Sequence, residues 1–143
     1  MHRIAWVIAG SFLMAAAAEL RAAQGDRSAA QILLLRAKEL GEATGERWSQ
    51  PETMRLEASL LCDNTADKFD LLYRALELSR GQGSKLWQLR IAIDLAEMQR
   101  DQGRQGEASE LLASILAGFA GGVDTPDLRR ATLLLKTLRL PAQ

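Results

Sequence analysis

The chain has 143 residues, a length typical of one domain, and 18 basic against 18 acidic residues give it a formal net charge of zero. This balance argues against a nucleic-acid or anionic-membrane binder, which would carry an excess of Lys and Arg. Ala and Leu supply 48 residues, whereas Val, Ile and Thr together supply 14. Because Ala and Leu favour helices and β-branched residues favour strands, the composition predicts an all-α domain.

The counts of cysteine and histidine exclude several kinds of site. Cys62 and His2 are the only residues of their types, so the chain can form neither an internal disulfide nor a zinc site of Cys and His ligands. A catalytic triad would depend on His2, which lies at the chain end. The motif G-x-x-x-x-G-K-[ST] does not occur, so no P-loop is present. We therefore predict a protein that is not an enzyme and has no catalytic, cofactor or metal site.

The first predicted helix runs from about Ile4 to Ala23. Residues 4–18 carry no charge, follow His2 and Arg3, and end in a run of alanines, which is the outline of a secretory signal peptide. The stretch is shorter than the ~20 residues that span a bilayer. Two interpretations stay open: the first helix of a helical repeat in a cytoplasmic protein, which we favour, or a leader of about 18 residues removed from a periplasmic protein.

Self-similarity at a period of about 39 residues organises the rest of the chain. Residues 33–40 and 71–78 are identical at six of eight positions, and Ala18, Gly25, Ala30 and Leu34 recur 78 residues later as Ala96, Gly103, Ala108 and Leu112. Apolar spacing predicts helices over 28–43, 51–62 and 66–80, then from Ser84 to the turn at 102–104, and over 105–119. The chain therefore contains three helix pairs, at about 4–44, 48–82 and 84–120.

Small residues in these helices alternate with leucines, as in the tetratricopeptide repeat (TPR). We expect Ala18, Ala58, Ala96 and the matching alanines of the second helices to lie at close helix contacts. The sequence Asp124-Thr125-Pro126-Asp127 is a helix-start signal. It predicts a seventh helix over 125–139 with a polar outer side, which would cap the array. We predict one domain over 1–143, a TPR-like α–α superhelix of three helix pairs and a C-terminal capping helix.

The sequence from about residue 45 to residue 138 resembles a known family. The segments are 45–48 (GERW), 54–61 (MRLEASLL), 74–78 (RALEL), 84–90 (SKLWQLR), 100–104 (RDQGR), Phe119 and 124–128 (DTPDL). In order and spacing they resemble the C-terminal tetratricopeptide region of large bacterial ATPase-type regulators. Those proteins often carry a class III nucleotide cyclase or winged-helix domain before a P-loop ATPase. The resemblance implies the helical-repeat tail of such a regulator without its enzymatic part.

The first helices of such repeats line the concave surface, where partners bind. Arg90, Asp94, Glu97 and Arg100 lie on the polar side of one first helix, and Arg55, Ser59 and Cys62 belong to the preceding one. These residues are candidates for a protein or peptide groove, or they are a solvated face with helical ion pairs. Trp48 and Trp87 each precede or begin a first helix. We expect both to pack between repeats as core residues, and the alternative is that they are exposed anchors for a partner.

The first helix is apolar nearly all round, including Trp6 and Phe12. A helix packed on one partner needs a single apolar stripe, so we expect the far side to bind a second copy of the chain or another protein. The predicted function is a non-catalytic protein–protein interaction module, derived from the tail of a bacterial signalling or transcription regulator. Two alternatives stay open: a detached part that regulates an ATPase or cyclase in trans, and an exported periplasmic repeat protein.

Overall fold

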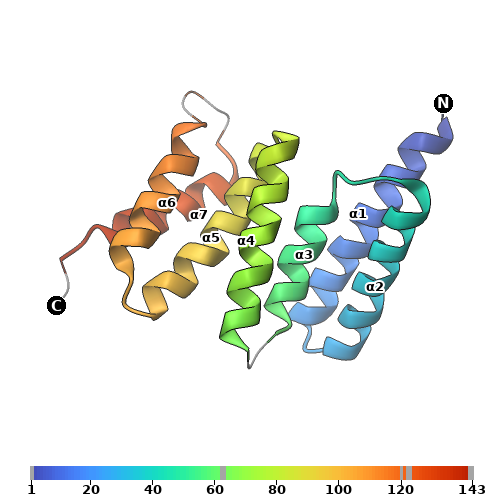
Figure 1. Ribbon diagram of the computed structural model, residues 1–143, viewed down its shortest axis with the longest axis horizontal. Coiled ribbons are helices and arrows are strands. Elements are labelled where there is room, and N and C mark those ends of the chain that lie inside the picture. The colour runs from blue at the N-terminus through green and yellow to red at the C-terminus, as the bar shows by residue number, and fades with distance from the viewer. Residues whose placement is uncertain (1, 62–63, 120, 122–123, 142–143) are drawn as a thin grey trace. The chain divides into compact units, whose positions relative to one another are not determined.

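A computed structural model describes residues 2–61, 64–119, 121 and 124–141, with residues 2–9 described as helical backbone only. The described residues form seven α-helices and no strand, which confirms the all-α prediction (Figure 1). The chain divides into two compact units, Met1–Leu78 and Ser79–Gln143, each with its own packing. That these act together as the one predicted domain stays a prediction.

The N-terminal unit consists of four helices in succession. They are α1 (His2–Ala23), α2 (Arg27–Thr44), α3 (Gln50–Ser59) and most of α4 (Thr65–Gln82). Helices α1 and α2 lie side by side, and both contact α3 (Figure 1). Their shared core holds three fully buried alanines that let the helices approach closely, with two leucines filling the remaining space. These residues are Ala15, Ala18, Ala30, Leu34 and Leu56.

The C-terminal unit contains α5 (Lys85–Asp101), α6 (Gln105–Ala117) and α7 (Pro126–Leu138). Helix α7 packs on both α5 and α6. Its start is fixed as the sequence predicts, because the Thr125 hydroxyl accepts a hydrogen bond from the Leu128 backbone N–H at 3.2 Å. Ala131, Leu134 and Leu138 are buried while Arg129 and Lys136 are exposed, which confirms the one-sided pattern of this helix.

The two glycine turns 78 residues apart have the same backbone geometry. Gly25 and Gly103 adopt φ values of +84° and +78°, a left-handed conformation that glycine reaches without steric cost. In each turn a backbone hydrogen bond also spans six residues. The Asp26 N–H donates to the Arg21 carbonyl oxygen at 2.9 Å, and the Arg104 N–H donates to the Gln99 carbonyl oxygen at 2.8 Å. The turns thus end α1 and α5 in the same way, as the repeat pattern predicts.

The predicted contact alanines are all buried. The exposed fraction is at most 1% for every one of them: Ala18, Ala30, Ala37, Ala58, Ala75, Ala96 and Ala108. Leu34 and Leu112, the matched leucines of the repeat, are buried as well. Their burial confirms that these small residues lie at helix contacts, and the repeat arrangement itself stays a prediction.

Several expectations about the helices need correction. Helix α3 ends at Ser59, three residues before the predicted end, and α6 ends at Ala117 rather than at Phe119. Not every apolar side chain of α2 is buried, since that of Ile32 is 53% exposed. Helix α2 contains four consecutive apolar residues, at positions 32–35, which point to different sides, so all four cannot face α1.

Replacing Ala96 by Leu tests the close contact of α5. Ala96 is completely buried, so we expect the larger side chain to lower the free energy of unfolding by about 1–3 kcal/mol through overpacking. Ala117→Leu on α6 is the matched control, because Ala117 is exposed and should tolerate the same change. Urea denaturation of both variants checks this, and equal midpoints would show that Ala96 has room around it.

Candidate functional site

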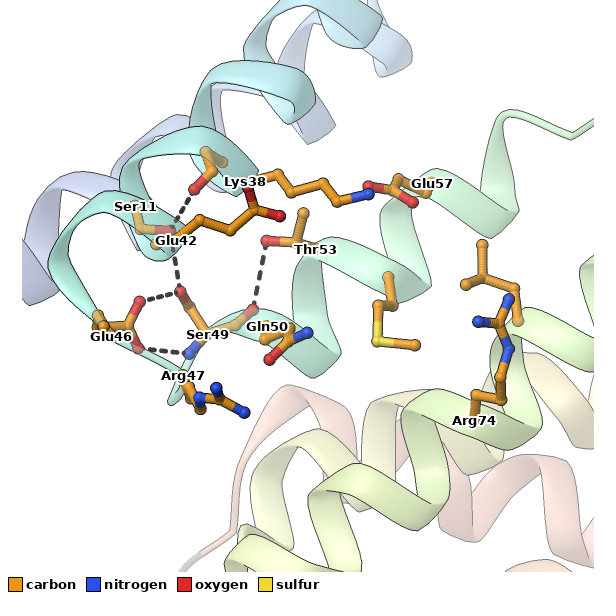
Figure 2. A pocket seen from close by; sticks show the side chains of 15 residues that line it. Ser11, Lys38, Glu42, Glu46, Arg47, Ser49, Gln50, Thr53, Glu57 and Arg74 are labelled. Carbon is orange, nitrogen blue, oxygen red and sulfur yellow. Dashed lines mark hydrogen bonds between the residues drawn. The ribbon is translucent and has the colours of Figure 1, made fainter.

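The N-terminal unit contains a cavity of about 430 Å³ lined by residues of α1 to α4 and of the loop before α3 (Figure 2). We call it the polar cavity. Its charged lining consists of Lys38, Glu42, Glu46, Arg47, Glu57 and Arg74. Its volume falls in the range of small-ligand sites.

A hydrogen-bond network joins three segments along one wall of the polar cavity. The buried Ser11 hydroxyl of α1 donates to the Ala37 carbonyl oxygen of α2 at 3.0 Å. The Ser49 hydroxyl lies 3.2 Å from Ser11 Oγ and 2.9 Å from Glu46 Oε2, and the Ser49 backbone N–H donates to Glu46 Oε1 at 2.9 Å (Figure 2). Glu46 therefore orders the loop before α3, and this wall of the cavity is preformed.

Glu57 of α3 is a half-buried carboxylate between two cations. Burial raises its pKa above the ordinary value, because it removes water from the charged form, while the nearby charges of Lys38 and Arg74 act in the opposite direction. Figure 2 shows the Lys38 ammonium directed toward the Glu57 carboxylate, and Glu42 extending into the same cavity. Arg74 also pairs with Asp70 of its own helix, at 3.1 Å.

The raised pKa predicts that Glu57→Gln stabilises the protein at neutral pH. A carboxyl group whose pKa is higher in the folded state adds stability below its ordinary pKa and loses that contribution as the pH rises through the folded value. The glutamine avoids this loss, so the variant should be more stable than the wild type at pH 7 and lose its advantage below about pH 4. Thermal melts across this pH range check the expectation, with Glu39→Gln as a control on exposed α2 surface. An advantage that does not change with pH would contradict it.

A second cavity of about 320 Å³ adjoins the first and shares Lys38, Glu57 and Leu71 with it. We call it the leucine cavity, because five leucines line it: Leu34, Leu35, Leu60, Leu61 and Leu71. Arg27 at its edge donates a hydrogen bond to the Leu60 carbonyl oxygen and so ties the start of α2 to the end of α3. Leu35 is 56% exposed, so apolar surface continues from this cavity onto the outside of α2.

Arg55, a predicted groove residue, forms ion pairs within the N-terminal unit. Its guanidinium pairs with Glu52, one turn earlier on α3, and with Glu19 of α1 at 2.7 Å. The Glu52 side chain is only 3% exposed and that of Arg55 11% exposed. Arg55 is thus the counter-ion of a buried carboxylate. Ser59, its predicted neighbour, is exposed on the last turn of α3, and Cys62 lies outside the described residues.

Two of the predicted groove residues of α5 form ion pairs with α7. Arg90 pairs with Asp127 at 3.0 Å and lies over the ring of Trp87 at 5.5 Å, and Glu97 pairs with Arg130 at 2.7 Å. Arg100 contacts its neighbour Asp101. Asp94, on the same helix, is half-buried. Glu97 thus takes part in an ion pair between two helices, α5 and α7.

The two tryptophans that were predicted to be core residues differ in burial. Trp87 is completely buried, whereas Trp48 is 45% exposed, so the prediction that both are core residues is wrong for Trp48. Trp48 packs against Phe12 of α1 with ring centroids 5.6 Å apart. Phe12 is half-buried by this contact, and the side chain of Trp6 lies outside the described residues. Phe12 and Trp48 thus form an aromatic pair at the surface of the N-terminal unit.

The residues that line the two cavities were not among the sequence candidates. Glu42, Glu57 and Lys38 sit on polar positions of ordinary amphipathic helices, where charge alone carries no signal. One available sign was the run of four apolar residues at 32–35, which is too wide for a single buried stripe. Among the described residues, no group of three or more His, Cys, Asp or Glu side chains is placed to hold a metal ion.

No family model, no curated protein and no solved structure matches this chain. In the part of the chain that the structure describes, none of the helices combines the length and apolar character needed to cross a bilayer. Any functional conclusion therefore depends on the geometry of the units themselves.

Proposed function

We propose that this protein is a non-catalytic protein–protein interaction module built from TPR-like helix pairs and acting in the cytoplasm. The leucine cavity is the observation that carries the proposal, because the exposed Leu35 and the half-buried Leu60, Leu61 and Leu71 leave apolar surface around an open concavity. Further large apolar side chains are exposed on the same unit, which is typical of a surface that contacts partners. They are Leu13, Leu20, Ile32, Trp48 and Tyr73.

The helical repeat pattern supports the same proposal. Equivalent glycine turns and equivalent buried alanines occur in both units, as expected for stacked helix pairs. Such arrays present extended surfaces made of side chains on rigid helices, and these surfaces suit binding of other chains. The resemblance to regulator tails is consistent with this role, and the polar cavity adds a place where specificity can arise.

Site-specific photo-cross-linking in the native host tests this function. A photoreactive residue in place of Leu35 should give a defined adduct with a partner protein, and the adduct should disappear when Leu61→Asn is added, because both residues line the leucine cavity. The matched control carries the photoreactive residue at Glu39, which is exposed on the same helix outside both cavities. The same adducts from both positions, or none from Leu35, would contradict an interaction surface here.

A nucleotide-binding test separates this module from an ATPase. We expect no saturable ATP binding up to millimolar concentration and no hydrolysis, because the sequence holds no phosphate-binding Gly-rich loop with its lysine. Isothermal titration calorimetry with Mg-ATP measures the binding. Saturable binding at micromolar ATP would contradict the non-catalytic function.

A further inference from the structure

The outer face of α7 presents cations and leucines in alternation. We call this face the α7 stripe, and it consists of Arg129, Leu133, Lys136 and Leu140. Spacings of four, three and four residues place side chains along one side of a helix. All four residues are exposed, Leu133 by 66% and Leu140 by 62%. Leu140 follows the end of α7, where its N–H still donates to the Thr137 carbonyl oxygen at 3.2 Å. The outer side of this helix, predicted to be polar, thus also carries two large apolar side chains.

The chain is neutral as a whole but strongly positive around the α7 stripe. Residues 128–143 contain four cations and no acidic residue, so residues 1–127 carry the matching excess of acidic residues. The net charge of zero therefore does not describe this face of the C-terminal unit. A local excess of one sign attracts a partner surface of the opposite sign. The charge of this face thus favours a partner that carries carboxylates or other anionic groups.

The cations of this face are only partly neutralised within the unit. Arg130 pairs with Glu97 of α5 at 2.7 Å. Arg129 lies 3.6 Å from Asp124, and these two side chains are 66% and 70% exposed, so their attraction contributes little to stability. In the part of the chain that the structure describes, Lys136 takes part in no ion pair. Both cations of the α7 stripe can therefore bind carboxylates of a partner.

The leucines of the α7 stripe favour a helix of a partner protein over other anionic partners. A helix that lies on a membrane inserts a broad apolar face into the lipid. The broad apolar face of α7 is already buried within its own unit, through Ala131, Leu134 and Leu138. Leu133 and Leu140 face outward with a cation between them, and the backbone of a nucleic acid would contact the cations alone. A second helix can place an apolar side chain beside each leucine and a carboxylate beside each cation, because its side chains recur at the same spacing.

We infer that the α7 stripe binds an amphipathic helix of a partner protein in which Asp or Glu alternates with large apolar residues at spacings of three and four. The acidic side chains pair with Arg129 and Lys136, and the apolar side chains pack on Leu133 and Leu140. At a rise of about 1.5 Å per residue the stripe is roughly 16 Å long, so the partner helix needs about three turns. This surface belongs to the C-terminal unit and is independent of the leucine cavity.

Selection from a phage library of helical peptides of about 15 residues, on the full 143-residue chain, tests this inference. We expect the selected peptides to carry Asp or Glu three or four residues from Leu, Ile, Met or Phe. A synthetic selected peptide should bind about tenfold more weakly when its acidic residues are replaced by Gln. Its affinity should also fall as the salt concentration rises, because salt screens exposed charges. Fluorescence anisotropy of the labelled peptide measures these affinities.

Protein variants show whether the selected peptide binds to the α7 stripe. The double variant Arg129→Gln, Lys136→Gln should lose about tenfold in affinity for the acidic peptide but not for its Gln version, and Leu133→Asn should weaken both. Thermal melts confirm that each variant is folded. The matched controls change exposed residues of the N-terminal unit and should bind normally. They are the double variant Arg21→Gln, Arg36→Gln and the single variant Leu20→Asn.

A vesicle assay separates a partner helix from a lipid surface. We expect the protein to stay in the supernatant after sedimentation with vesicles of phosphatidylcholine and phosphatidylserine in equal parts. Vesicle binding that the variant Arg129→Gln, Lys136→Gln loses would overturn the inference, because lipid would then be the partner of the α7 stripe. Selection of no peptide, or of peptides that bind all the variants equally, would overturn it as well. Neither result affects the proposed function, which the cross-linking at Leu35 tests separately.

Discussion

Trp87→Ala is expected to lower the free energy of unfolding by about 3–5 kcal/mol. Trp87 is completely buried at the start of α5, so removing the indole leaves a cavity among helices that cannot collapse far. The change also removes the ring over which the Arg90 guanidinium lies. Urea denaturation followed by circular dichroism measures the loss.

Trp48→Ala is the matched control for this truncation. The same indole is removed, but Trp48 is 45% exposed, with its ring against Phe12, so we expect a loss of about 1 kcal/mol or less. Equal losses from the two variants would show that the burial of the two tryptophans does not differ as the structure describes.

Arg55→Met is expected to lower the free energy of unfolding by about 3 kcal/mol. Methionine keeps much of the apolar stem but leaves the Glu52 carboxylate, 3% exposed, without the guanidinium that pairs with it. A buried carboxylate that loses its counter-ion keeps its desolvation cost without the compensating attraction. Chemical denaturation at pH 7 measures the change.

A double-mutant cycle shows whether the loss comes from the buried charge. Adding Glu52→Gln to Arg55→Met should restore most of the stability, because the uncompensated charge is then absent. Glu19→Gln removes the exposed partner of the same arginine and should cost no more than about 0.5 kcal/mol. If the double variant is less stable than Arg55→Met alone, the buried ion pair does not explain the effect.

Arg55 has a structural role that its place on a helix does not reveal, and its place in a binding groove stays a prediction. Its position on a first helix predicted a groove residue, and an arginine on a polar helix face gives no sign of its partners. The structure adds Glu19, 36 residues away, and buries Glu52 beside it. A pull-down with Arg55 variants would therefore need the stability measurement above, since loss of binding could follow from loss of folding.

The candidate site depended on long-range contacts in the same way. The hydroxyls of Ser11 and Ser49 meet although 38 residues separate them, and Ser11 bonds to Ala37 across 26 residues. Lys38 and Glu57 meet because α2 and α3 pack together. Each of these side chains, taken alone, occupies an ordinary polar position of its segment. No local sequence pattern could therefore predict the two cavities.

By itself the sequence determined the features that depend on neighbouring residues. Composition fixed the helical class, Gly25 and Gly103 fixed two turns, Thr125 fixed the start of α7, and the spacing of small residues marked alanines that are buried. These signals are local, because backbone preferences and helical periodicity act within a few residues. Only the tertiary structure decided that Trp87 is buried and Trp48 exposed and that Arg55 neutralises Glu52. It also decided that leucines of α2, of α4 and of the segment after α3 surround an open cavity. Burial and charge pairing depend on which distant residues the fold brings together. Local patterns in the sequence do not reveal those partners.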